Sequence, residues 1–553
     1  MPQKPSSPAA DGSGGRTLHW AIPLVFALLA VLRLYPIWAF DYFPSQDGPS
    51  HLYNARVMSE FAREPIFAKY FALRLTPAGN LSSHLWLAAV GRITGALVAE
   101  KLLLSAIVLS LPLIWLWFLF RLPNGKPELA LLGFVLVMNL PFFMGFWNFC
   151  LAISFGFLLM GVAVQRQKPW GMWSIAGLVA LSGLSYASHA MVWAGMVVSI
   201  LLWWEAEVRL RRQKAEGAKR SEVKAVWPKL RMATYLALLW PLLLLLWYLA
   251  QKEMNPPLYA IPLIERIWFL FGGGILSGGT LDSMPIVRSV YVLGLIAIGS
   301  AAILLRRRYW RGLAASDVLG LVALGAGVLT LVLPNTLGSM VYATPRLALL
   351  SALFFVVWLG AQPLGSRWRT AVVIFSVATA GLQAARQIPA IAGWQPAIRE
   401  IASLGQDLPP GSVVISLQAN ARTNGPNNPL LHAVGYWQLN YVNVRNFEAV
   451  APHFPVRFVD GQGPNGPLGE LGDAQAIPSQ FRIRREDWAR SGKIDTVVVT
   501  GATGGSLEEE LQKQTWDPDN LFTLRAVSMP EGRALLYRLR EPVATDRPDG
   551  SSR

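Results

Sequence analysis

A polar stretch at residues 40–56 directly follows a strongly apolar segment and carries an aspartate and a histidine four residues apart, Asp47 and His51. Ionisable groups at the edge of a membrane are costly to place and usually serve a function. A carboxylate there can accept a proton from a substrate or hold a divalent ion. The same aspartate also suits a helix cap, because Asp before Gly-Pro is a favourable helix start. We therefore expect Asp47 to begin a helix and to carry a chemical role.

His51 falls one helical turn beyond Asp47, on the same face of the expected helix. An ionised Asp47 would make His51 easier to protonate. The imidazolium could then contact a phosphate or fix the orientation of the carboxylate. The alternative is an interfacial histidine whose hydrogen bonds are satisfied by its neighbours.

The composition is that of a polytopic membrane protein. Of the 553 residues, 53% are apolar and 15% are charged, against about 25% charged in soluble proteins. The net charge of +16 gathers in short connections between apolar segments, such as 205–231 and 306–311, which is the positive-inside pattern of cytoplasmic loops. This pattern argues against nucleic acid as a partner. The single cysteine, Cys150, lies in an apolar run and is expected to serve as packing.

Apolar segments of about twenty residues, enough to span a bilayer as helices, recur along the first 390 residues. Placing the basic loops inside puts the N-terminus in the cytoplasm and the C-terminus outside. Segment 81–98 is then predicted to be a tilted or partly inserted helix on the outer side, and 258–278 a second such element. The predicted spans are 18–38, 101–120, 128–145, 148–164, 171–187, 188–204, 232–250, 286–305, 315–333, 343–361 and 370–387.

The composition of the sequence changes after about residue 390, where turn residues become frequent and apolar runs become shorter. Segments 412–417 and 495–500 read as buried strands, 522–529 and 534–539 as a terminal strand pair, and 395–404 and 506–514 as helices. The glycine-rich turn 501–505 resembles a phosphate loop, with an ordinary strand-to-helix turn as the alternative. Near the N-terminus, 50–72 has helical spacing typical of helices in the plane of the interface.

The predicted fold class is a polytopic α-helical membrane protein, with about 11–13 transmembrane helices and a small C-terminal α/β extracytoplasmic domain. It is predicted to be a multi-pass protein of the inner or plasma membrane, with a periplasmic C-terminal domain. The predicted parts are a disordered cytoplasmic tail (1–16), a transmembrane module (17–390) whose outer loop (40–80) carries the acidic motif, the α/β domain (391–540) and a disordered tail (541–553).

A cytoplasmic N-terminus, one span and an outer loop that opens with an acidic motif together resemble the GT-C superfamily of membrane glycosyltransferases. This superfamily includes protein O-mannosyltransferases, aminoarabinose transferases and oligosaccharyltransferases. Its pattern has an aspartate at the head of an outer-loop helix, an aromatic residue or histidine three or four residues on, and an alanine further along; Asp47, His51 and Ala55 fit it. The resemblance covers roughly residues 18–390.

The resemblance implies that the chain moves a sugar from a polyprenyl-phosphate carrier to a glycan, lipid or protein acceptor outside the cytoplasm. Asp47 would take the catalytic acidic position, with His51 beside it. Arg346 resembles the cationic residue that such enzymes carry near the outer end of a late span, where a guanidinium suits the carrier phosphate. The alternative for Arg346 is an arginine that snorkels to the lipid interface.

Three further residues are candidates for substrate binding. His189 opens a predicted span on the outer side and either lines the same cavity or packs between helices. His84 lies in the predicted outer helix, and Asp41 at the end of the first span is otherwise a surface charge. Glu265 is a weaker candidate of the same kind.

A metal is left open by the sequence. Family members often carry a second acidic residue in the next outer loop, but here that loop, 139–148, has no carboxylate. A divalent cation, Mg²⁺ or Mn²⁺, would therefore have Asp47 as its one assured ligand, and hard divalent ions need several oxygen ligands.

Two other classes of protein compete with a glycosyltransferase. A transporter or a lipid or glycolipid flippase would need charges deep within its spans and paired interrupted helices in related halves, and no internal symmetry is evident. A binding protein or assembly factor would use the membrane part only as an anchor, for which eleven predicted spans are far more than is needed.

Overall fold

The computed structural model describes two compact units, each built from several stretches of the chain. Unit 1 comprises Met1–Phe43, Pro77–Ser83 and Lys101–Ile391, and unit 2 comprises Pro44–Thr76, His84–Glu100 and Ala392–Arg553. The predicted outer loop 40–80 thus contributes most of its residues to unit 2. The structure describes residues 14–74, 79–122, 124–164, 172–215, 227–250, 261–271, 273–278, 285–309, 313–336, 341–418, 427–444, 446–451, 454–459, 494–501 and 522–539.

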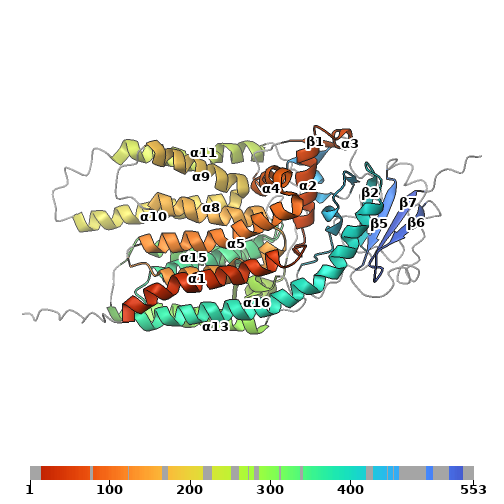
Figure 1. Cartoon of the computed structure of the whole chain (residues 1–553). Coiled ribbons are helices and arrows are strands. Elements are labelled where there is room, and N and C mark those ends of the chain that lie inside the picture. Colours follow the sequence, from red (N-terminus) through yellow and green to blue (C-terminus); the bar gives the residue numbers. More distant parts are fainter. Residues whose placement is uncertain are drawn as a thin grey trace, which may run out of the picture. The chain divides into compact units, whose positions relative to one another are not determined.

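Unit 1 is a bundle of long apolar helices that run side by side (Figure 1). Seven helices among the described residues are long and apolar enough to cross a membrane, so the chain is a multi-pass membrane protein. All but one of the predicted spans are single helices. The long helices are α1 (Gly14–Trp38), α5 (Ala96–Arg121), α8 (Trp147–Val164), α9 (Met172–Ser188), α10 (Ala190–Ala215), α11 (Trp227–Ala250), α13 (Pro285–Tyr309), α14 (Asp317–Val332), α15 (Ala343–Gly360) and α16 (Ser366–Ser403).

The predicted span 128–145 is wrong, because this segment is broken into three short turns. These are η1 (Pro127–Leu132), α6 (Gly133–Leu136) and α7 (Leu140–Phe143). Pro141 has no N–H for a continuous helix, and the Asn139 side chain starts a new turn by accepting from the backbone N–H of Phe142 at 2.9 Å. The segment is buried, and hydropathy alone does not distinguish such a core segment from a span.

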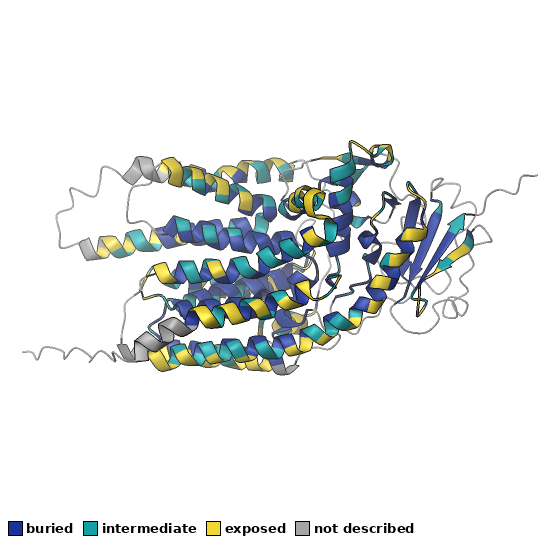
Figure 2. Ribbon diagram, in the orientation of Figure 1, coloured by how far each residue is buried: buried dark blue, intermediate teal, exposed yellow. Residues whose placement is uncertain are grey.

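The helices of unit 1 bury different fractions of their surface, as Figure 2 shows. Most of α8 is buried, as expected of a helix that is apolar all round at the centre of a bundle. By contrast, α11 and α13 expose large apolar side chains such as Leu243 and Leu293. An apolar exposed face of this kind is typical of contact with lipid.

Unit 2 contains a mixed sheet of five strands in the order β3-β2-β5-β7-β6. The strand β2 pairs in parallel with β3 and β5, whereas β7 pairs antiparallel with β5 and β6. The predicted strands at 412–417 and 495–500 and the predicted terminal pair are confirmed. The predicted helix 506–514 and turn 501–505 lie largely outside the described residues. The strands are β2 (Val413–Gln418), β3 (Val442–Asn443), β5 (Thr496–Thr500), β6 (Phe522–Val527) and β7 (Ala534–Leu539).

The segment after α1 folds into unit 2 rather than forming a separate loop. Its strand β1 (Phe71–Leu73) pairs antiparallel with β4 (Val456–Phe458). Its helix α2 (Gly48–Glu60) is buried over most of its length, so the amphipathic spacing that predicted an interfacial helix reflects packing within the unit. The remaining short elements are α3 (Pro65–Tyr70), α4 (Ser82–Thr94), α12 (Leu263–Phe271), η2 (Gly274–Leu276), η3 (Leu404–Asp407), η4 (Ala433–Tyr436) and α17 (Phe447–Val450).

Candidate active site and metal-binding cluster

Asp47 occupies the N-cap position of α2, as the sequence predicted, but its side chain makes no capping hydrogen bond. Pro49 lies near the first position of the helix and has no N–H that would need a cap. Its fixed φ also favours the start of a helix. Asp47 is 9% exposed. The carboxylate is therefore largely shielded from bulk water at the start of α2.

The Asp47 carboxylate is held among polar groups of unit 2. Its Oδ1 atom accepts a hydrogen bond from Nε2 of Gln46 at 3.3 Å and lies 3.8 Å from Nε2 of His432. The second distance is too long for a hydrogen bond but short enough for a charge contact. Gln46 is held in turn, since its Oε1 accepts from the backbone N–H of Asn428 at 3.0 Å.

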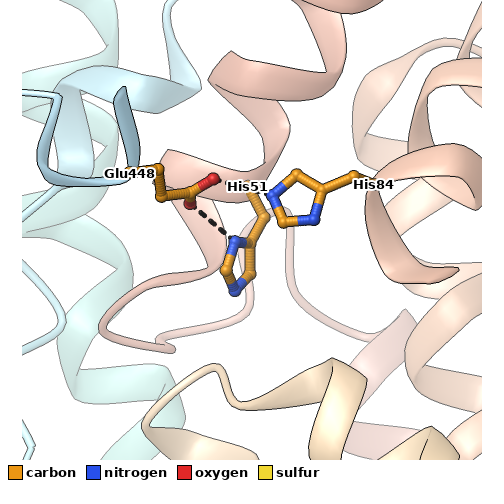
Figure 3. Close-up of side chains that lie close together, drawn as sticks. All are labelled: His51, His84 and Glu448. Carbon is orange, nitrogen blue, oxygen red and sulfur yellow. Dashed lines mark hydrogen bonds and ion pairs between the residues drawn. The ribbon is translucent and has the colours of Figure 1, made fainter. Parts of the chain in front are cut away.

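One turn beyond Asp47, His51 belongs to a buried cluster with His84 and Glu448 (Figure 3). Nδ1 of His51 lies 2.7 Å from Oε1 of Glu448, and Nε2 of His84 lies 2.7 Å from Oε2. The two imidazoles meet edge to face at 4.8 Å, and Phe454 packs against both rings. The cluster therefore ties α2 and α4 to α17, which carries the glutamate.

The charge of this cluster follows from its geometry. Burial alone would raise the pKa of the Glu448 carboxyl, but the charges and hydrogen bonds of His51 and His84 outweigh burial and leave that pKa well below its ordinary value. Glu448 is therefore an ionised carboxylate that accepts one N–H from each imidazole. Within the described residues, Nδ1 of His84 is buried and has no hydrogen-bond partner.

The same three side chains offer a donor set for a metal ion. One ligand atom from each of His51, His84 and Glu448 lies within 4.8 Å of the others. Two imidazoles and a carboxylate are ligands typical of Zn²⁺ and similar ions rather than of Mg²⁺. The contacts at 2.7 Å are hydrogen-bond lengths, whereas ligand atoms of a tetrahedral zinc site stand about 3.3 Å apart. A metal would therefore fit if the two imidazoles lost the N–H protons that face Glu448 and the nitrogen–oxygen distances increased slightly.

The sequence predicted part of this arrangement. It named Asp47, His51 and His84, and the structure brings all three into unit 2. It missed Glu448 and His432, which lie in a segment of turns with no motif around them. Asp47 itself is not among the residues of the metal-capable cluster in the described part of the chain.

Arg346 and His189 lie in unit 1, and both are close to the ring of Phe149. Arg346 is in the first turn of α15 and is 8% exposed, with its guanidinium 4.1 Å from the centre of the Phe146 ring and 5.6 Å from that of Phe149. His189, between α9 and α10, meets the same Phe149 edge to face at 5.3 Å. The structure thus groups these two predicted residues around Phe149.

The remaining predicted residues lie at the surface of unit 1. Asp41 is exposed in the bend after α1, and Glu265 is exposed in the first turn of α12. Neither is grouped with Arg346 or His189 by any contact described above.

Comparison with known proteins supports the fold. The sequence matches no protein-family profile and no curated protein sequence. The structure resembles the crystal structure of ArnT from Cupriavidus metallidurans in the apo state, with a TM-score of 0.54, 10% sequence identity, and coverage of 94% of this chain and 98% of that chain. The crystal structure of ArnT from the same organism bound to undecaprenyl phosphate gives a TM-score of 0.49 at the same identity and coverage.

The chain therefore has the fold of ArnT. The likeness extends over almost the whole of both chains, so it includes the helical bundle and the C-terminal sheet alike. At this sequence identity the comparison establishes architecture, and the activity has to be argued from the residues of the site.

Proposed function

We propose that the chain is an integral membrane glycosyltransferase, which moves a sugar from a polyprenyl-phosphate carrier to a glycan, lipid or protein outside the cytoplasm. The observation that carries this proposal is the Asp47 carboxylate, which stands at a helix start without capping it and is held by Gln46 close to His432. The ArnT-like fold favours a transferase over a transporter or flippase, by analogy.

Asp47 acts as the base in this proposal. The bond between the sugar C1 and the phosphate oxygen breaks, and a bond forms between C1 and a nucleophilic atom of the acceptor. The acceptor proton passes to Asp47, and the bonding electron pair leaves with the carrier phosphate. A carboxylate is suited to this role because it accepts the proton as the nucleophile attacks.

Arg346 is the proposed site for the carrier phosphate. Its guanidinium is almost fully buried against Phe146 and Phe149. A planar guanidinium can give two parallel hydrogen bonds to a phosphate, and aromatic cover strengthens those bonds by excluding water. His189, which meets Phe149 edge to face, packs against the same ring. The positive-inside rule puts the N-terminal end of α15 on the outer side of the membrane.

The cluster of His51, His84 and Glu448 is the proposed metal site, with Zn²⁺ or a similar ion as its occupant. The donor set is nitrogen-rich, which suits Zn²⁺ or a similar ion better than Mg²⁺ or Mn²⁺. When bound, such an ion would supply positive charge one helical turn from Asp47. The residues themselves orient α2, since His51 and Asp47 share that helix.

The proposal is tested by deleting the gene and comparing cell-envelope glycans and glycolipids by mass spectrometry. We expect one sugar linkage to disappear, to return with the wild-type gene, and to stay absent with Asp47→Asn, which keeps the size of the side chain but cannot accept a proton. Glu60→Gln, at the far end of α2, is the matched control and should restore the linkage. Normal product with Asp47→Asn in folded, membrane-inserted protein would refute the assignment.

A further inference from the structure

A series of contacts joins α2 to one segment in the C-terminal part of unit 2, residues 427–448. The phenol of Tyr53 donates to the carbonyl of Tyr441 at 3.0 Å and accepts from the backbone N–H of Asn443 at 2.9 Å. Glu448 binds His51 on the same helix. The helix that carries Asp47 is therefore positioned by residues that come nearly four hundred positions later in the chain.

His432 is the member of this segment whose side chain faces Asp47. It immediately precedes the turn η4, which is anchored on both sides. The Tyr441 hydroxyl donates to the carbonyl of Val434 at 2.7 Å, and Nε1 of Trp437 donates to the carbonyl of Ile401 at 2.7 Å. The backbone that carries His432 is thus fixed from two directions.

The ring of His432 is fixed as well. It stacks on Phe447 with ring centres 4.8 Å apart and an angle of 30° between the planes. This stacking restricts rotation of the imidazole and directs Nε2 to within 3.8 Å of Oδ1 of Asp47. A side chain whose rotamer is locked by packing can hold a catalytic group to within a fraction of an ångström.

We propose that His432 is a positioning residue for Asp47, an inference that rests on the proposed transferase function. The Nε2–H of His432 and the Nε2–H of Gln46 both point toward Oδ1 of Asp47. In the proposal, both donors hold this oxygen in the substrate complex and so fix the direction of the carboxylate. The separation of 3.8 Å shortens to a hydrogen bond when substrate binds, because catalytic hydrogen bonds often tighten only in the complex.

The test compares three substitutions by the rate at which each restores the missing envelope product in the deletion strain. The amide nitrogen of glutamine reaches the place of Nε2 in histidine, whereas that of asparagine reaches the place of Nδ1. We expect His432→Gln to remain close to wild type, and His432→Asn and His432→Ala to be slower by about 100-fold, as for a misplaced catalytic group. Val450→Ala, at an exposed position nearby, is the matched control.

The outcomes separate this inference from the proposed function. Wild-type rates with His432→Ala, alongside an inactive Asp47→Asn, would overturn the role of His432 and leave the transferase proposal standing. Equal defects in His432→Gln and His432→Ala, with unchanged thermal melting of both, would also overturn it, because the donor at Nε2 would then be irrelevant. Normal product with Asp47→Asn would remove the function on which the inference rests.

Discussion

Asn54 and Asn446 exchange two hydrogen bonds between their side-chain amides. Nδ2 of Asn54 donates to Oδ1 of Asn446 at 3.1 Å, and Nδ2 of Asn446 donates back to Oδ1 of Asn54 at 2.7 Å. Both side chains are buried. With Asp47 and His51, Asn54 lies on the face of α2 that meets the C-terminal segment, because the spacing is one and two helical turns.

Breaking this amide pair should destabilise unit 2. Replacing either Asn54 or Asn446 by alanine leaves the partner amide buried without the two hydrogen bonds of the pair, which costs about 1–3 kcal/mol. The double variant Asn54→Ala/Asn446→Ala should melt no lower than the worse single variant, because no orphaned partner remains. Thermal melting of the purified protein measures this, and strictly additive losses would contradict the pairing.

A methyl group at residue 435 should displace the start of α2. A Cβ added to Gly435 would lie 2.1 Å from the backbone oxygen of Pro49, whereas one added to Gly393 on α16 would meet nothing within 4 Å. We expect Gly435→Ala to slow product formation by about 100-fold through misplacement of Asp47. Gly393→Ala is the control and should be neutral or more stable by up to about 1 kcal/mol.

If Gly435→Ala forms product at the wild-type rate, the close approach of η4 and α2 does not matter for Asp47.

The buried glutamate should make stability depend on pH. The pKa of Glu448 in the folded protein lies below its ordinary value of 4.5. The ionised carboxylate therefore stabilises the fold in full above that value, and this contribution is lost as the pH falls below 4.5 and through the lower folded pKa. Glu448→Gln should lower the melting temperature at neutral pH and flatten its fall in acid.

Melting curves of wild type and Glu448→Gln between neutral pH and strong acid provide the measurement. Parallel curves over the whole range would contradict a depressed pKa.

Metal content tests the proposed ion site without any assay of activity. Protein purified from zinc-supplemented cells should contain about one zinc per chain by elemental mass spectrometry, as expected of a site with three protein ligands and a fourth position for water. His84→Ala and Glu448→Ala should lose the metal. His189→Ala removes a buried histidine outside the cluster and should retain it.

A metal-free wild-type protein under these conditions would leave the cluster as a hydrogen-bonded link between α2, α4 and α17.

Local features could be predicted well from the sequence. The start of α2 after Asp47 follows from Asp before Gly-Pro, and the buried strands β2 and β5 follow from continuous β-branched runs. The broken segment 127–143 was misread because a buried turn and a membrane span have the same hydropathy. Each of these predictions, whether right or wrong, rested on the pattern of a few neighbouring residues.

The partners of these local features could not be predicted in the same way. His51 and His84 stand out as rare ionisable residues beside apolar segments, but Glu448 lies in a four-residue helical turn with no pattern around it. His432 likewise becomes notable only when Phe447 orients its ring. Long-range pairing of this kind is set by tertiary packing, and one sequence carries no local signal for it.

The antiparallel pairing of β1 with β4 has a consequence for biosynthesis. The ribosome produces the two strands roughly 20–80 s apart at about 5–20 residues per second. Throughout this interval the early strand presents an unpaired edge, which is prone to join strands of other molecules. Unit 2 therefore cannot be completed until β4 has been made, so its early segment waits for the last fifth of the chain before it reaches its folded pairing.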